Sequence, residues 1–163
     1  MSSRQEIGEI SVKSCKLEWK IDNFFSYRQD MTLESPDFPI LDTMWYLKIS
    51  PDDFIESSSK EYVSLCLRRR DYKIPQTIEY RLGLKNVNNT IDYERVQIAT
   101  FIDCGWGYPE FVKRSDLLQR KCELVPSGSL TVACTVTGKN VTSNLDSSKY
   151  KLEIIFHPSK ITI

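Results

Sequence analysis

The feature of this sequence that most constrains its fold is an alternation of apolar and polar residues with a period of two. Four runs show it clearly, at residues 45–49, 62–68, 78–84 and 130–136. In the first run, Trp45, Leu47 and Ile49 lie on one side and Lys48 lies on the other. Successive side chains of a β-strand point to opposite faces, so each run is predicted to be an antiparallel strand with one buried face.

Weaker alternation and turn residues complete this pattern. The weaker runs are 17–21, 96–102 and the tail at 151–156. Segments rich in Pro, Asn and Gly separate the runs, at 50–53, 74–75, 86–90, 126–129 and 138–140. Seven or eight short strands with such punctuation indicate two packed antiparallel sheets, an all-β sandwich.

One segment, 109–118, is predicted to be helical. Pro109 suits the first turn of a helix, where a missing N–H costs nothing. The residues expected to face the core from this helix are Phe111, Val112, Leu117 and Leu118.

Composition excludes several classes of partner. Twenty-two basic residues balance 22 acidic ones, so no overall field draws the chain to nucleic acid or to an anionic membrane. No apolar stretch approaches the length of a membrane span, and the first residues are polar, unlike a secretion signal. The five cysteines are odd in number and scattered. We therefore expect an intracellular protein, in the nucleus or the cytoplasm.

The residues needed for enzyme chemistry are not assembled in any motif. His157 is the sole histidine and lies in the tail, where we expect it to be exposed to solvent. No cysteine pair has metal-ligand spacing, and the 105–107 segment lacks the later glycine or lysine of a phosphate-binding loop. The sequence therefore predicts a protein that is not an enzyme and that binds neither a metal ion nor a cofactor.

The triplet Arg68-Arg69-Arg70 allows two interpretations. It could bind phosphate or serve as an address signal, or it could be a solvated strand end followed at once by Asp71. Three residues are fewer than such basic signals use, so the solvated strand end is favoured.

Several segments resemble those of a known family in the same order. The segments 17–24 (LEWKIDNF), 45–51 (WYLKISP) and 62–65 (YVSL) resemble the early strands of MATH (TRAF-like) domains. The later Gly105-Trp106-Gly107-Tyr108 element, followed by the pattern through Leu118, is the most specific match. The resemblance covers roughly residues 15 to 137 and is strongest to the MATH half of speckle-type POZ and TD-and-POZ proteins.

That resemblance implies an eight-stranded sandwich with one short helix and a shallow peptide groove on one sheet. In speckle-type POZ proteins an extended peptide, an apolar and a polar residue followed by Ser and Thr, adds to a sheet edge. A POZ domain then docks a cullin, and the captured protein is ubiquitinated and degraded by the proteasome. Carried over, the groove residues are Lys48, Cys66, Tyr80, Ala99, Gly105, Trp106, Gly107 and Tyr108.

The alternation supports part of this set. Lys48 and Cys66 lie opposite the core residues of their strands, as a surface groove requires, whereas Tyr80 belongs to an inward-alternating strand. Trp106 is either a core aromatic residue under a turn or a peptide contact, and the second is favoured because buried aromatic anchors carry binding energy.

Departures from the family pattern affect the expected specificity. Cys66 and Ala99 stand where the grooves of the family carry tyrosine, and the loop 103–105 is one residue shorter and lacks the usual lysine. Pro109 and Glu110 replace a lysine pair. We expect a groove that no longer reads the same Ser/Thr-rich motif. Cys66 and Cys104 are interpreted as plain surface or half-buried thiols rather than a redox site.

The predicted organisation is an N-terminal extension (1–14), a MATH domain (15–141), and a linker and tail (142–163) whose alternation would allow an added strand. No POZ domain is recognised after residue 141, so the chain is expected to be either a fragment or a lone domain, monomeric in the latter case. A TRAF-type receptor scaffold is the alternative, although the stretch before Leu17 is too short for the coiled coil of such trimers.

Overall fold

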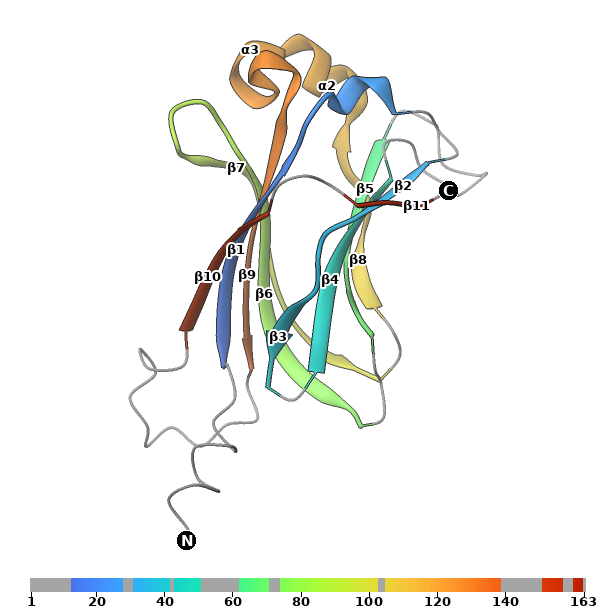
Figure 1. The fold of residues 1–163 in the computed structure, drawn as a ribbon, viewed down its shortest axis with the longest axis vertical. Coiled ribbons are helices and arrows are strands. Elements are labelled where there is room, and N and C mark those ends of the chain that lie inside the picture. Colours follow the sequence, from blue (N-terminus) through green and yellow to red (C-terminus); the bar gives the residue numbers. More distant parts are fainter. Residues whose placement is uncertain are drawn as a thin grey trace, which may run out of the picture.

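Two β-sheets face each other in a computed structural model of the chain (Figure 1). The structure describes residues 13–27, 31–41, 43–50, 62–70, 74–102, 105–138, 151–156 and 160–162. His157, which was predicted to be exposed to solvent, and Cys104, which was interpreted as a plain surface or half-buried thiol, lie outside these residues.

The first sheet has five strands in the order β10-β1-β9-β6-β7. These strands are β10 (Lys151–Phe156), β1 (Ser14–Ile21), β9 (Leu130–Gly138), β6 (Gln76–Lys85) and β7 (Ile91–Phe101). All neighbours are antiparallel except β1 and β10, which run parallel. The tail thus pairs with β1, and β7 ends the sheet on the other side.

The second sheet has six strands, with the order β11-β2-β4-β5-β8 and a short β3 paired to β4. They are β11 (Lys160–Thr162), β2 (Thr32–Glu34), β3 (Phe38–Ile40), β4 (Thr43–Ser50), β5 (Tyr62–Arg69) and β8 (Gly105–Lys113). Strand β8 ends this sheet, so the chain passes from the last strand of one sheet to the last strand of the other.

The core lies between the sheets and is built from the alternate residues that the period of two selects. Val63, Leu65 and Leu67 of β5 are fully or almost fully buried, and so are Trp19 of β1 and Trp45 of β4. The ring of Trp45 meets Phe101 edge to face, with 4.8 Å between ring centroids, which joins the two sheets.

The predicted sandwich is confirmed, with differences in detail. Every predicted run lies within a strand, except that Ile102, the last residue of the run 96–102, lies just after β7, and seven strands have eight or more residues. The described residues form eleven strands, because the short β2, β3 and β11 and the tail strand β10 add to these seven.

The predicted helix begins later than expected. Residues 109–113 continue strand β8, and the helix α2 spans only Arg114–Gln119, followed by α3 (Lys121–Leu124). Pairing with β5, distant in sequence, overrides the local helical signal, and Pro109 lies where the register of the two strands shifts. Leu117 is buried but Leu118 is half exposed. Neither these short helices nor any other in the described part of the chain has the length and apolar character needed to cross a bilayer.

The basic triplet is not simply a solvated strand end, because Arg69 is buried with 2% of its surface exposed. It continues the inward face of Val63, Leu65 and Leu67, so the alternation carries its side chain inside. The neighbouring Arg70 lies outside, where it stacks on Tyr46 and pairs with Glu34 and Asp37. The prediction was therefore wrong for Arg69.

Candidate functional site

Strand β8 is an edge strand that carries four of the predicted site residues, Gly105, Trp106, Gly107 and Tyr108. It pairs with β5 on one side and, among the described residues, with no strand on the other. An unpaired edge presents main-chain N–H and C=O groups that another chain can bind. The strand therefore has the geometry needed for strand addition.

Trp106 is exposed at this edge, with 46% of its surface accessible. Its register partner on β5 is Leu67, which is completely buried. Paired residues share a face, so Trp106 belongs to the inner side of the sheet but lies at its margin, where the core ends. Of the two interpretations of Trp106, burial as a core residue is thus excluded.

Gly107 is required because of its close approach to β5. A Cβ atom at this position would overlap the Cα and Cβ atoms of its partner Cys66 and the carbonyl oxygen of Leu65. Because two of these atoms belong to the backbone, a side chain at residue 107 would force the two strands apart. The glycine therefore holds the Trp106 segment against β5.

Lys48, Cys66 and Gly107 form one row across the outer face of the six-stranded sheet, since Lys48 pairs with Cys66 and Cys66 with Gly107. Lys48 and Cys66 are both half-buried, as the alternation predicted. The row therefore lies on one face of the sheet, and Trp106 and Tyr108 lie on the other. Strand β8 contributes residues to both faces.

Tyr80 lies inside the molecule rather than on its surface. It is completely buried on β6, and its hydroxyl donates a hydrogen bond of 2.9 Å to Gln97 Oε1. The hydroxyl of Tyr108 donates to the same oxygen at 3.1 Å, so Gln97 on β7 links β6 to β8. Burial raises the pKa of Tyr80 above its ordinary value. Tyr80 therefore packs beside Tyr108 in the interior and shares its hydrogen-bond acceptor.

Arg95 closes the gap between the two edge strands. Its guanidinium lies 5.0 Å from the ring centroid of Tyr108 and donates a 3.0 Å hydrogen bond to the carbonyl of Phe111. Ala99 lies on the same inward side of β7 and is 7% exposed. The structure thus places Tyr80 and Ala99 in the wall of the sandwich and leaves Trp106 as the exposed aromatic residue of the predicted set.

Arg95 and Gln97 were not identified from the sequence. On β7 the apolar Val96 and Ile98 point outward and are about half exposed, while the polar Arg95 and Gln97 point inward. On β7 the alternation rule would therefore predict the wrong face as buried. Gln97 points inward because it accepts hydrogen bonds from Tyr80 and Tyr108, which lie on other strands.

The cysteines give a testable difference in reactivity. Cys15 and Cys134 are buried on β1 and β9, and burial raises the pKa of Cys15 to about 12 and that of Cys134 well above its usual value. We expect these two thiols to resist iodoacetamide at pH 8 in the folded protein while exposed Cys122 and half-buried Cys66 react. Peptide mapping by mass spectrometry with and without denaturant measures this, and early labelling of Cys134 would contradict it.

Comparison with known proteins assigns the family. A family model described as MATH domain matches residues 16–136, which is more than half of the chain. The chain belongs to the MATH domain family. MATH domains are in general non-catalytic binding modules that bind peptides. The match includes every residue of the predicted site.

The MATH domain described here is also similar to TD and POZ domain-containing protein 2 of Mus musculus. The two share 27% identity over 145 residues, covering 79% of this chain and 38% of that protein. The chain therefore spans well under half the length of this relative.

Proposed function

We propose that this MATH domain binds an extended peptide by strand addition to β8, with Trp106 as the central anchor. The observation that carries the proposal is the exposure of Trp106 on an edge strand that has one free side among the described residues. Main-chain hydrogen bonds to the edge would supply affinity, and side chains beside Trp106 would supply selectivity.

The length of edge available to a peptide is short. Pro109 has no N–H to donate, and the carbonyl of Phe111 already accepts a hydrogen bond from Arg95. We therefore expect the main-chain contacts of the peptide to be confined to Gly105–Tyr108. A segment of this length supports modest affinity, near micromolar, or about −8 kcal/mol.

The side chains around this segment favour a peptide that differs from the Ser/Thr-rich motif. Cys66 and Ala99 offer no aromatic wall, and Ala99 is buried. Trp106 remains as the main apolar contact, whereas Lys48 lies on the opposite face of the sheet, in the row of Cys66 and Gly107. We expect an apolar residue of the peptide to lie on Trp106 and the positions that follow it to be weakly selected.

The cellular role proposed is substrate recognition for a cullin-RING ubiquitin ligase, in proteasomal protein degradation. The similarity to a protein whose name includes a POZ domain supports this role, because a POZ domain is the part that would contact the cullin. The protein would then act inside the cell, in the nucleus or the cytoplasm. A TRAF-type scaffold would instead be a trimer, so a monomer in analytical ultracentrifugation is expected and a trimer would favour the scaffold.

Replacing Trp106 with alanine should test the proposed anchor. We expect a loss of about 2 kcal/mol in binding free energy, or roughly thirtyfold in affinity, because an exposed aromatic anchor at the centre of a site dominates binding. A peptide selected on an array would be titrated into the purified domain by isothermal titration calorimetry. Leu118→Ala, which removes a side chain of similar exposure on α2, is the matched control. Unchanged affinity in Trp106→Ala would remove β8 from the site.

A further inference from the structure

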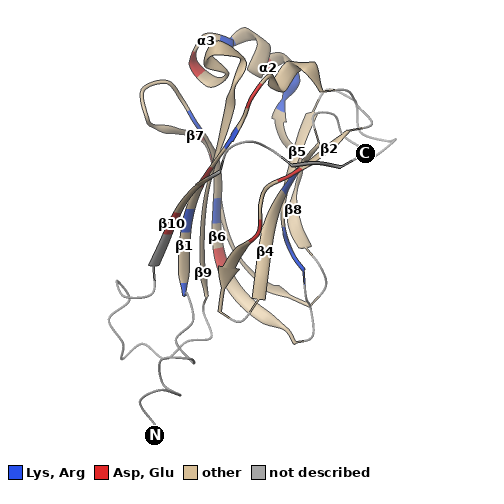
Figure 2. Ribbon diagram, viewed as in Figure 1, with Lys and Arg blue, Asp and Glu red and all other residues tan. Residues whose placement is uncertain are grey.

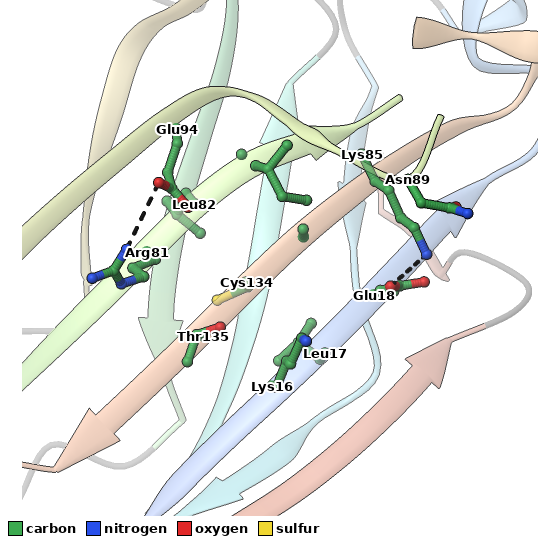
Figure 3. A pocket seen from close by; sticks show the side chains of 13 residues that line it. Lys16, Leu17, Glu18, Arg81, Leu82, Lys85, Asn89, Glu94, Cys134 and Thr135 are labelled. Atoms are coloured by element: carbon green, nitrogen blue, oxygen red, sulfur yellow. Dashed lines mark hydrogen bonds and ion pairs between the residues drawn. The ribbon is translucent and has the colours of Figure 1, made fainter. Parts of the chain in front are cut away.

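A separate hollow lies on the outer face of the five-stranded sheet, away from strand β8. It has a volume of about 350 Å³ and is lined from β1, β9, β6 and β7 (Figure 3). A second hollow of about 390 Å³ adjoins it, with Glu18, Lys85 and Asn89 lining both. Together they form a trough that follows the direction of β1 and β9. No residue of β8 lines either part.

The trough exists because the sheet carries very small residues at its centre. Gly83 of β6 pairs with Ala133 of β9, and Ala133 pairs with Glu18 of β1. A Cβ atom at Gly83 would overlap the side chain of Ile91, which leans over it from β7. The hollow lies over Ala133, whose side chain is shorter than those of Thr131 and Thr135 on the same face of β9.

Charged side chains surround this floor. Figure 2 shows basic and acidic residues on β1 and β6, and Figure 3 shows ion pairs on two sides of the hollow. Lys85 Nζ lies 2.8 Å from Glu18 Oε2, and Arg81 Nη1 lies 3.7 Å from Glu94 Oε1. Both carboxylates that line the trough are thus engaged at its sides.

Two lysines of the trough make no ion pair with the described residues. Lys16 and Lys20 lie on either side of Glu18 on the outward face of β1. With Arg81 and Lys85 they give the trough four basic side chains against two acidic ones, in a chain whose net charge is zero. Asn89, Thr131 and Thr135 add hydrogen-bond donors along the same surface. The surplus of cations and donors favours an anionic ligand.

The spacing of these groups matches an extended polypeptide. Lys16 and Lys20 are four residues apart on a strand, hence about 13 Å apart along it. An extended peptide lying along the trough repeats its side-chain direction every two residues, at about 6.6 Å. Carboxylates on alternate residues would therefore meet the two lysines in register, whereas a single small anion would reach only one.

We propose that this trough binds a short acidic segment of a partner protein in extended form, with carboxylates on alternate residues. Lys16 and Lys20 receive the carboxylates at the two ends, and the short side chain of Ala133 leaves room for the peptide backbone. The Glu18–Lys85 pair, which lines both hollows, lets a central carboxylate of the ligand compete with Glu18 for Lys85. This site is independent of the proposed strand addition at β8.

The test is a titration of the ¹⁵N-labelled chain with the peptide acetyl-Glu-Ser-Glu-Ser-Glu-amide, followed by amide chemical shifts. Saturable shifts are expected on β1 around Lys16 to Lys20 and on β9 around Ala133. Ala133→Leu should weaken binding at least tenfold because its side chain fills the hollow, while Ala133→Ser, which keeps the hollow open, should not. Replacing both Lys16 and Lys20 with alanine should weaken binding about tenfold, and added salt should weaken it further.

Several outcomes would overturn the proposal. The peptide acetyl-Gln-Ser-Gln-Ser-Gln-amide should not bind, so equal shifts with this peptide would exclude carboxylate recognition. Tighter binding of a single-stranded oligothymidine to the same residues would assign the trough to nucleic acid. Loss of binding in Trp106→Ala would place the acidic peptide on β8 instead, whereas unchanged binding in that variant keeps the two sites distinct.

Discussion

Replacing Arg69 with methionine is expected to lower the free energy of unfolding by about 3 kcal/mol. The guanidinium donates to the carbonyls of Ile74 and Phe101 at 2.7 and 2.8 Å, and to Gln76 Oε1 at 3.2 Å. Methionine fills much of the same space but removes the donor from these acceptors, and the bonds to Gln76 and Phe101 are buried. Urea denaturation followed by tryptophan fluorescence measures the change.

Arg70→Met is the matched control, since it changes the same residue type at the next position of the chain, just after β5. Arg70 has 35% of its side chain exposed and pairs with Glu34 and Asp37 at the surface. Surface ion pairs contribute little, so we expect a loss under about 1 kcal/mol. Equal losses in the two variants would show that the hydrogen bonds of Arg69 do not stabilise the fold as inferred.

The effect of Arg69 should extend to the proposed peptide site. The carbonyls of Phe101, the last residue of β7, and of Ile102, which follows it, accept from Arg69 Nη2 just before the chain passes to Gly105 and Trp106. A change at Arg69 therefore alters the end of the strand from which this connection begins. We expect Arg69→Met to weaken peptide binding even at temperatures where the domain stays folded.

Replacing Gly107 with alanine is expected to cost about 2 kcal/mol of stability and to weaken peptide binding at least tenfold. The added Cβ would overlap backbone atoms of Cys66 and Leu65, and backbone can yield only if β8 moves away from β5. That movement displaces Trp106. Thermal denaturation and calorimetric titration with the selected peptide measure the two effects.

Gly105→Ala is the control for Gly107→Ala. It tests whether the loss of stability arises from the lack of space at residue 107 or from any side chain added to β8. Gly105 lies two residues earlier, on the same face of β8 as Gly107. The atom nearest to a Cβ there is Arg68 Cγ, a side-chain carbon that can move, with Leu67 O at 3.0 Å. We expect a loss below about 1 kcal/mol for this variant. A larger loss for Gly105→Ala than for Gly107→Ala would contradict the account of the β5–β8 contact.

The sandwich could be predicted from the sequence because its strands obey a local rule. Val63, Leu65 and Leu67 show the period of two without reference to any partner, and they are buried as predicted. The prediction of a helix beginning at Pro109 was wrong because residues 109–113 instead continue strand β8, which pairs with β5, and only the folded chain brings β5 beside them. Structure that depends on the residues of one strand could thus be predicted from the sequence, whereas structure that depends on pairing with a distant strand could not.

The same distinction applies to the residues of the candidate site. Three features follow from the order of amino acids, namely the β-sandwich, the resemblance to the MATH family and the outward position of Lys48 and Cys66, because alternation and motif order are properties of the chain alone. Tertiary structure decided that Trp106 is exposed while Tyr80 is buried, since both are aromatic residues on strands and differ in what covers them. It also decided that the charged Arg69 is accepted at the end of its buried face, because the carbonyl of Phe101, 32 residues away in sequence, and that of nearby Ile74 both accept from its guanidinium.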